Sequence, residues 1–442
     1  MSKMTEKRAE RKEIRESIPK KEKPKKRKKY VFGAFARWLV SLIFPHKYKI
    51  KYSHDPNLKG LKPPYFLLGN HTSFLDPFLM SVGNRHHVNY VANDEYFRYR
   101  SLAFLMKMLG AVPKTKFMTD SETVRRIFRL KENGDVIGIY PEGGRTWPGL
   151  TQPLLFSTAK LIKRLKIPVV CALTKGGSLS FPRWARKYRK VRIFIHYFLL
   201  LAPEQIETMT AEEIHRALTA ALAHDEIAWN REAKIRFNGK KLAEHLEWYI
   251  YACPRCGRLE TLRSKNDLYT CEACGYSVRY TEYGLFESAN GVGKSGNDGL
   301  PKGQNGGAPV YDNVTDWSFA QYAILKQNLA ALTGGEVLLR RDNVTLFQGQ
   351  RRERVLGSVL RGTLLFTKDG FSLDGGGETK LFPFDKVRGL QINYKNVIDF
   401  YLGDEKLRLE FDDKEACGYI WEDAMKALKE LKAESPDSDI SN

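Results

Sequence analysis

The sequence lacks a long uninterrupted apolar segment. Its longest apolar run, Tyr30 to Phe44, is shorter than the ~20 residues that a membrane-spanning helix requires, and it contains Arg37. The basic stretch before this run is too long for a secretory signal, and no small-residue cleavage site follows it. We therefore expect neither a transmembrane helix nor a secretory signal.

Acidic residues are few relative to basic ones. The chain has 51 Asp and Glu against 73 Lys and Arg, a formal net charge of +22. This excess predicts an anionic partner, which would be nucleic acid, a membrane surface or a phosphorylated substrate. The 442 residues are 42% hydrophobic, which is sufficient for folded cores and predicts two to four domains.

Cysteine is also scarce, with six residues in the chain. Four of them form two Cys-x-x-Cys pairs, each followed by glycine: Cys253, Cys256, Cys271 and Cys274. This spacing is typical of a zinc ribbon, in which four thiolates complete the tetrahedron of a structural Zn²⁺. A redox dithiol is the alternative, but it would not need both pairs. This pattern of paired cysteines suits a protein in a reducing compartment.

Polar residues follow an apolar strand candidate, Tyr65 to Leu68. His71 and Asp76 are five residues apart, so inside one helix they would lie roughly 140° apart and could not meet. They meet if His71 lies in the turn and Asp76 begins the helix. The carboxylate would then fix the imidazole tautomer and leave the other ring nitrogen as a base. The alternative is a capping aspartate beside a surface histidine.

A second strand candidate, Val136 to Tyr140, runs into Pro141 and a short charged loop. Glycines there let backbone amides approach an anion, and Arg145 offers a planar fork suited to phosphate. A purely structural turn would need no arginine. The loop that we assign to substrate binding consists of Glu142, Gly143, Gly144 and Arg145.

The two motifs together resemble the glycerolipid acyltransferase family, over roughly residues 31 to 235. The resemblance implies that His71 deprotonates an acceptor hydroxyl, that Asp76 orients His71, and that the hydroxyl attacks an acyl thioester. It also implies that Glu142, Gly143 and Arg145 help to hold the acceptor's phosphate end. The expected function is acyl transfer from acyl-CoA or acyl carrier protein to a lysophospholipid, in the first place 1-acylglycerol-3-phosphate, giving phosphatidic acid. Another lysophospholipid or a glycolipid is the alternative acceptor.

The sequence departs from the family pattern in two places. Gly144 stands where the family often has threonine, and Lys114 and Lys116 stand where it often has an arginine-bearing block. We place both lysines in the predicted substrate site, but lysine binds phosphate as a point charge rather than as a fork. The acceptor headgroup therefore stays open. A basic and aromatic stretch, residues 183–190, suits a membrane rim or a phosphate backbone equally well.

Residues 1–29 carry 14 Lys or Arg against five Glu and precede the aromatic-rich run Tyr30 to Phe44. A polybasic arm beside an apolar helix predicts binding to an anionic membrane surface. We expect a peripheral or monotopic protein on the cytoplasmic face of the cell membrane. A nucleic-acid tail before a core helix is the alternative. The alternative function, a zinc-ribbon nucleic-acid-binding protein, would leave both strand-end motifs unexplained, so we expect no nucleic-acid partner.

The predicted fold class is an α/β acyltransferase domain, followed by a small zinc ribbon and a C-terminal mostly-β barrel with a closing helix. The barrel resembles pleckstrin-homology or GRAM-type domains, and a structural or dimerisation barrel is the alternative. The predicted divisions are a disordered polybasic arm, an interfacial helix, the acyltransferase domain, the ribbon, a Gly-rich linker, the barrel and a disordered tail: 1–29, 30–52, 53–235, 236–288, 289–311, 312–433 and 434–442.

Local patterns also predict individual elements. Strands are expected at 65–68, 88–92, 136–140, 168–173 and 191–198, and helices at 121–131, 156–166 and from Thr210 to about Asp225. The apolar segment 102–109 is expected to be a core helix or the lining of an acyl groove. The ribbon is expected to have strands at 259–262 and 268–270. The barrel is expected to have strands at 336–339, 343–347, 362–367, 371–373, 387–393, 397–402 and 407–411 and a helix at 414–431.

Overall fold

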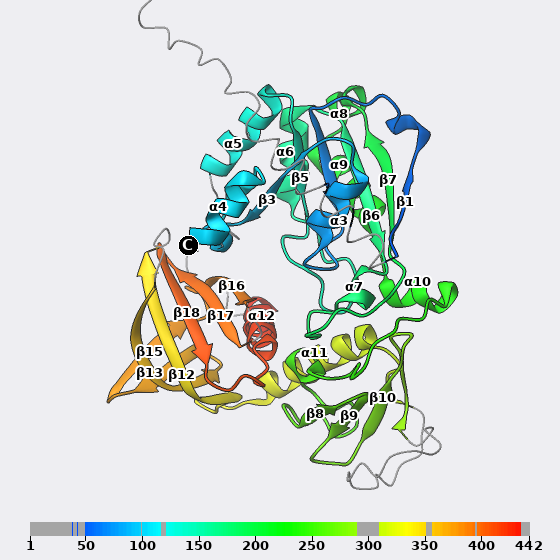
Figure 1. Cartoon of the computed structure of the whole chain (residues 1–442). Helices are drawn as coiled ribbons and strands as arrows, with labels where there is room; N and C mark the ends of the chain where they lie inside the picture. Colours follow the sequence, from blue (N-terminus) through cyan, green and yellow to red (C-terminus); the bar gives the residue numbers. More distant parts are fainter. Residues whose placement is uncertain are drawn as a thin grey trace, which may run out of the picture.

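The computed structural model describes Trp38, Leu42 and residues 49–98, 100–115, 121–289, 309–350, 356–393 and 396–434. The predicted polybasic arm, most of the interfacial helix, most of the Gly-rich linker, most of the C-terminal tail and Lys116 lie outside these residues. None of the helices in the described part combines the length and apolarity needed to cross a membrane. The described chain forms an α/β domain, a small sheet and a half-barrel (Figure 1).

The α/β domain is built on a seven-stranded sheet of order β1-β7-β6-β2-β5-β3-β4. Its central strand, β2, is completely buried and pairs in parallel with β5 and β6, which explains its unbroken apolar run. The strands are β1 (Lys51–His54), β2 (Tyr65–Gly69), β3 (Val88–Asn93), β4 (Val112–Lys114), β5 (Val136–Ile139), β6 (Val169–Lys175) and β7 (Phe194–Leu201).

All five strands predicted for this domain are present, although β7 begins three residues later than expected. The short edge strands β1 and β4 were not predicted, because neither has an apolar run. β1 also begins at Lys51, inside the range predicted for the interfacial helix. That range therefore ends before residue 51.

Helices cover both faces of the sheet. They are α3 (Asp76–Gly83), α4 (Arg100–Met108), α5 (Ser121–Glu132), α6 (Phe156–Leu165), α7 (Gly177–Ser180), α8 (Pro203–Thr208), α9 (Ala211–Leu222) and α10 (Glu226–Ala233), with the short 3-10 helices η1 (Pro56–Leu58), η2 (Asp94–Phe97) and η3 (Leu246–Trp248). Thr210 forms the predicted capping box of α9 with Glu213. The helix predicted to end at about residue 225 ends at Leu222, and Asp225 instead caps the next helix, α10, by accepting from the N–H groups of Ile227 and Ala228.

The alternation of β2 divides the core into two layers. Phe66 and Leu68 pack with α6, α8 and α9 on one face. Tyr65 and Leu67 belong to the cluster on the other face, which also contains Trp248, Tyr269 and Trp317 from the segments after residue 235. The small sheet is therefore packed on the α/β domain through a shared core.

The small sheet has the order β11-β10-β9-β8. Its antiparallel strands are β8 (Leu262–Lys265), β9 (Leu268–Cys271), β10 (Ser277–Tyr280) and β11 (Phe286–Ser288). The strand predicted at 259–262 is wrong by about three residues. Leu259 instead makes an isolated bridge with Ala252, next to the first cysteine pair.

The C-terminal part is a seven-stranded antiparallel sheet of order β15-β14-β13-β12-β18-β17-β16, preceded by α11 and followed by α12 (Figure 1). Its elements are α11 (Val314–Ala331), β12 (Leu339–Gln350), β13 (Gly357–Thr367), β14 (Gly370–Gly375), β15 (Glu378–Pro383), β16 (Arg388–Asn393), β17 (Val397–Leu402), β18 (Glu405–Phe411) and α12 (Tyr419–Glu434).

The predicted closed barrel is a half-barrel. Within the residues that the structure describes, β15 and β16 stand at opposite edges of the sheet and do not pair. The apolar interior is covered by helices instead, since Trp421 and Leu428 of α12 and Leu325 of α11 are buried in the same cluster as the strands. The strands predicted at 336–339 and 343–347 merge into the single strand β12, and β15 was not predicted.

Four charged side chains join the half-barrel to the α/β domain. Glu95 of η2 contacts Lys406 and Arg408 of β18, and these two also contact Asp399 of β17. None of the four side chains is more than 12% exposed. The half-barrel is thus attached beside β3 and α4 by a buried ion network.

Candidate active site

His71 and Asp76 meet at the end of β2. Nδ1 of His71 lies 2.9 Å from Oδ2 of Asp76. His71 lies in the turn, and Asp76 is the first residue of α3, which is the arrangement that the five-residue spacing predicts. The His71 ring stacks on that of Tyr140, the residue after β5, at a centroid distance of 4.2 Å. The imidazole is thereby held from two sides.

The Asp76 carboxylate is fixed before any substrate arrives. Its side chain is fully buried, and Oδ2 accepts hydrogen bonds from the backbone N–H groups of Thr72 (2.6 Å) and Ser73 (2.8 Å). The hydroxyl of Thr72 donates to the other oxygen at 3.1 Å. These donors stabilise a negative charge beside the imidazole, which favours the neutral tautomer that carries its proton on Nδ1.

Glu142 connects the two strand-end loops. One carboxylate oxygen accepts from the backbone N–H of His71 at 2.6 Å, and the other accepts from Gln152 N at 2.7 Å. Burial raises the pKa of Glu142 to about 8, although these two N–H donors act in the opposite direction. Both oxygens are engaged with the backbone, so a contribution of Glu142 to phosphate binding would be indirect.

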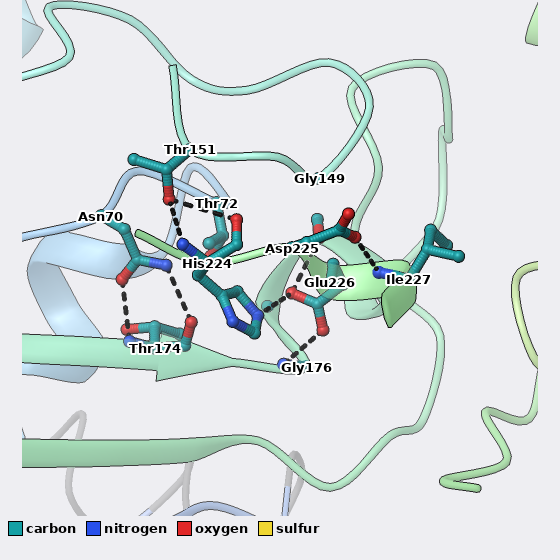
Figure 2. Close-up of polar contacts among 12 residues, drawn as sticks. Asn70, Thr72, Gly149, Thr151, Thr174, Gly176, His224, Asp225, Glu226 and Ile227 are labelled. Atoms are coloured by element: carbon teal, nitrogen blue, oxygen red, sulfur yellow. Dashed lines mark hydrogen bonds and ion pairs between the residues drawn. The ribbon is translucent and has the colours of Figure 1, made fainter. Parts of the chain in front are cut away.

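Asn70 and Glu226 form buried hydrogen bonds with the backbone near this region. The sequence predicted neither of them as a site residue. The amide of Asn70 exchanges two hydrogen bonds of 2.8 Å with the backbone of Thr174 at the end of β6 (Figure 2). Glu226 accepts from Gly176 N at 2.5 Å and lies 3.3 Å from His224. In the sequence, Asn70 was visible only as part of the polar turn, and Glu226 as an ordinary helical acid.

A large cavity opens beside His71. Its volume is about 1160 Å³, slightly above the range of about 300–1,000 Å³ that is usual for ligand sites. Apolar residues of α4 and α5 line it, among them Leu102, Met106 and Ile127, and β16 of the half-barrel contributes Ile392. The segment expected as a core helix or an acyl groove thus forms part of a groove wall.

The predicted phosphate-binding residues occupy the same cavity in part. Gly143, Gly144, Arg145 and Lys114 all line it, whereas Lys116 lies outside the described residues. Gly143 has a φ of +71°, which favours glycine at this turn. The N–H of Thr146 donates to the carbonyl of His71 at 2.9 Å, so the loop that carries Arg145 is bonded directly to the turn that carries His71.

The four paired cysteines converge where strand β9 ends at Cys271. Their sulfur atoms all lie within 4.8 Å of one another, with Cys253 Sγ 3.7 Å from Cys274 Sγ and Cys256 Sγ 3.9 Å from Cys271 Sγ. A tetrahedral zinc site with Zn–S bonds of about 2.3 Å requires sulfur atoms about 3.8 Å apart. The four residues therefore fit a zinc ion.

Part of the α/β domain is similar to known proteins. Residues 49–174 match the family model described as Acyltransferase. Over 165 residues the chain is 26% identical to the protein named 1-acyl-sn-glycerol-3-phosphate acyltransferase BAT2, chloroplastic, of Brassica napus, which covers 36% of this chain and 47% of that protein. The 1-acyl-sn-glycerol-3-phosphate acyltransferase of Bacillus subtilis is 25% identical over 109 residues, which cover 24% of this chain and 54% of the relative.

A solved structure of the 1-acyl-sn-glycerophosphate acyltransferase PlsC from Thermotoga maritima aligns at a TM-score of 0.37 and 14% identity, over 44% of this chain and 76% of that one. The chain spans about half the length of the curated relatives that it matches. The small sheet and the half-barrel lie after the segment that the family model matches. Residues 49–174, which lie in the α/β domain, are thus similar to glycerolipid acyltransferases.

Proposed function

We propose that this protein is an O-acyltransferase that moves a fatty acyl chain from a thioester, acyl-CoA or acyl carrier protein, to the free hydroxyl of a lysophospholipid. The acceptor that we propose is 1-acylglycerol-3-phosphate, which would give phosphatidic acid. The observation that carries the proposal is the 2.9 Å contact between His71 and the fully buried Asp76, beside a cavity that Arg145 also lines. The names of the relatives support the same reaction.

The reaction follows from the tautomer. With its proton on Nδ1 held by Asp76, His71 takes the proton of the acceptor hydroxyl on Nε2. The hydroxyl oxygen attacks the thioester carbonyl, the carbon–sulfur bond breaks, and the thiolate leaves with the proton that His71 received. Three hydrogen bonds from Thr72 and Ser73 hold the Asp76 carboxylate in place beside the imidazole. The protein needs no nucleophile of its own.

The acyl chain has a place in the cavity. Leu102 and Met106 of α4 and Ile127 of α5 give its wall an apolar surface, while Arg145 and Lys114 provide positive charge in the same space. This combination suits a lipid with an anionic head and an apolar tail. We assign the apolar wall to the acyl chains and the charged part to the phosphate.

We further propose that the outer face of α4 and α5 lies against an anionic membrane. Phe104 and Leu105 of α4 are 65% and 37% exposed, and α5 exposes Arg125 and Arg129. Apolar side chains flanked by basic ones are typical of interfacial surfaces. This face borders the cavity, so a lipid acceptor would reach His71 from the bilayer without passing through water.

Vesicle sedimentation tests the membrane face. Phe104→Asp should reduce binding to vesicles of mixed phosphatidylcholine and phosphatidylglycerol several-fold. Leu381→Asp is the matched control, because Leu381 is 67% exposed but lies on the half-barrel strand β15. Equal binding by the two variants would contradict the proposed face.

The zinc site is proposed as structural. Four thiolates close the tetrahedron, so Cys253, Cys256, Cys271 and Cys274 would leave no position for a reacting water. Gly257 and Gly275 follow the two pairs with φ of +70° and +72°, and each donates its N–H to the first cysteine of its pair at 2.9 Å. Elemental analysis should find one zinc per chain, and zinc-free folded protein would contradict the assignment.

The reaction itself is tested on liposomes with a labelled acyl thioester and a panel of lysophospholipids. We expect transfer to lysophosphatidate above all other acceptors, with acyl-CoA and acyl carrier protein compared as donors. Absence of transfer to every lysophospholipid, by protein that binds the vesicles and is folded, would refute the proposed function.

A further inference from the structure

Arg183 is a cationic side chain of the cavity that no motif identifies. It lies nine residues beyond the segment that the acyltransferase model matches, in the loop after α7. Its side chain lines the same cavity as His71 and Arg145. It belongs to the basic and aromatic stretch for which the sequence left a membrane rim or a phosphate partner open.

The Arg183 guanidinium is held rigidly from two directions. Nη1 donates to the backbone carbonyl of Arg145 at 2.9 Å, and the guanidinium carbon lies 4.0 Å from the ring centroid of Trp147. Trp147 in turn stacks on Tyr249 at 5.1 Å with an interplanar angle of 2° and contacts Tyr419 of α12. Residues from outside the acyltransferase segment therefore pack against Trp147, the ring that holds this cation.

The Arg183 guanidinium forms no ion pair with any of the residues that the structure describes, although the charge of Glu422 of α12 acts on it from farther away. Among the residues that the structure describes, none places a carboxylate oxygen within ion-pair distance of Arg183 or of Arg145. Burial, together with the charge of Arg145, lowers the pKa of Arg183 to about 9, although the charge of Glu422 acts in the opposite direction, so the side chain remains protonated at neutral pH. A mostly buried charge without a counter-ion is costly, and an anionic ligand would offset that cost.

A neighbouring arginine shows the contrast. Arg186 lines the same cavity, but its guanidinium lies 3.3 Å from a carboxylate oxygen of Glu415, and its side chain is 57% exposed. Its charge is already compensated within the protein. Arg183 and Arg145, joined by one hydrogen bond, have no such ion pair among the residues that the structure describes.

We propose that Arg183 and Arg145 together bind the phosphate monoester of the acceptor, and that Arg183 selects this headgroup over phosphodiester headgroups. The proposal rests on the proposed function. A phosphate monoester carries about −1.5 to −2 charges at pH 7, which two guanidinium groups neutralise. A lysophospholipid with a phosphodiester carries a single negative charge on its phosphate, which Arg145 alone would balance. The second arginine therefore adds affinity mainly for the monoester.

The location favours the acceptor over the donor as the source of the phosphate. In 1-acylglycerol-3-phosphate the free hydroxyl and the phosphate are on neighbouring carbon atoms, so the phosphate must bind close to His71. The loop of Arg145 meets this condition, because the adjacent Thr146 N–H donates to the His71 carbonyl at 2.9 Å. The phosphate monoester of acyl-CoA lies at the far end of that molecule from the thioester.

Steady-state kinetics of Arg183→Gln test the proposal, with Arg186→Gln as the matched control. For Arg183→Gln we expect KM for lysophosphatidate to rise about 10- to 100-fold, the effect of one lost charge-assisted contact. KM for lysophosphatidylglycerol, a phosphodiester, should change less than about threefold, and KM for acyl-CoA should not change. Arg183→Lys should recover part of the loss, because it keeps the charge without the planar fork. Arg186→Gln should leave the preference for lysophosphatidate unchanged.

Three results would overturn the proposal. An equal rise in KM for both acceptors would show a purely structural role for Arg183. An unchanged preference for lysophosphatidate would show no role, and a raised KM for acyl-CoA alone would place the donor at this site. Wild-type protein that transfers to no lysophospholipid would instead refute the proposed function. If Arg183→Gln does not fold, inhibition of acyl transfer by the wild-type protein tests the proposal instead. sn-Glycerol 3-phosphate should inhibit more strongly as its second proton is lost near pH 6, whereas its methyl ester should not, and equal pH profiles would refute a dianion site.

Discussion

The buried ion network between the half-barrel and the α/β domain allows a quantitative prediction. Lys406 Nζ lies 2.5 Å from Glu95 Oε2 and 3.0 Å from Asp399 Oδ2, and its side chain is 2% exposed. Arg408 contacts the same two carboxylates at 2.8 and 2.7 Å. Burial alone would raise the pKa of Glu95 and of Asp399, but the charges of Lys406 and Arg408 hold both pKa values below their usual range.

Replacing Lys406 by methionine keeps most of the side-chain volume and removes one of the charges. Two nearly inaccessible carboxylates then share Arg408, with Arg98 3.2 Å from Glu95 as a further cation. Breaking a buried pair in this way typically costs about 3–5 kcal/mol, because the remaining charge is left without its partner. We expect the double variant Lys406→Met with Glu95→Gln to lose less than the sum of the two single variants, by about 0.5–3 kcal/mol.

Chemical denaturation at neutral pH measures the stability cost of Lys406→Met and its coupling to Glu95→Gln. The matched control is Arg126→Met, because Arg126 forms an exposed pair with Glu122 whose side chains are 45% and 48% exposed. That pair should contribute no more than about 1 kcal/mol. The contribution of the buried network should be present above the unfolded carboxyl pKa near 4 and be lost as pH falls through the lower folded values. A cost for Lys406→Met no larger than that for Arg126→Met would refute the reasoning.

Three further predictions concern the catalytic pair, the half-barrel and the metal site. Asp76→Asn should lower kcat by at least ~10²-fold with little change in KM, because the amide stabilises neither the Nδ1 tautomer nor the imidazolium, and steady-state kinetics of acyl transfer will show it. Burial raises the pKa of Asp423 to about 7, so the folded chain holds this proton more tightly than the unfolded chain does. The free energy of unfolding should therefore fall as pH rises from about 4 to 7. Thermal melts of Asp423→Asn should show a weaker fall. Removing zinc with a chelator should lower the melting temperature of the wild type but not that of a folded Cys256→Ser variant that has already lost its metal.

The sequence predicted best what depends on neighbouring residues. The contact between His71 and Asp76 follows from a strand, a turn and a helix start within seven residues, and the buried strands β2, β5 and β6 follow from their apolar runs. The cysteine spacing likewise brings the four sulfur atoms together. In each case the local pattern and the tertiary structure require the same arrangement.

The remaining features depend on distant segments. Closure of the C-terminal sheet depends on whether β15 reaches β16, which no local pattern encodes, and α12 covers the interior instead. The edge strands β1 and β4 are short and only partly buried, so they carry no apolar signal. Glu142 has the residue type of the motif, yet its carboxylate bonds to the backbone of His71 and Gln152, which only the folded loops reveal.

Arg183 illustrates the same limit at the site. Its basic and aromatic surroundings are visible in the sequence, but its place beside Arg145 depends on Trp147, Tyr249 and Tyr419, which come from three separate segments. The half-barrel similarly reaches the cavity through Ile392, more than 300 residues after His71. Regions that follow the acyltransferase segment thus help to shape its cavity.

Acyl transfer by His71→Ala tests the central claim most directly. The assay measures transfer of a labelled acyl chain from its thioester to lysophosphatidate on liposomes, with His196→Ala as the control, since His196 is an exposed histidine of β7. The account predicts that the wild type and His196→Ala form phosphatidic acid, and that His71→Ala is slower by at least ~10²-fold while remaining folded. Transfer by His71→Ala at the wild-type rate would contradict it.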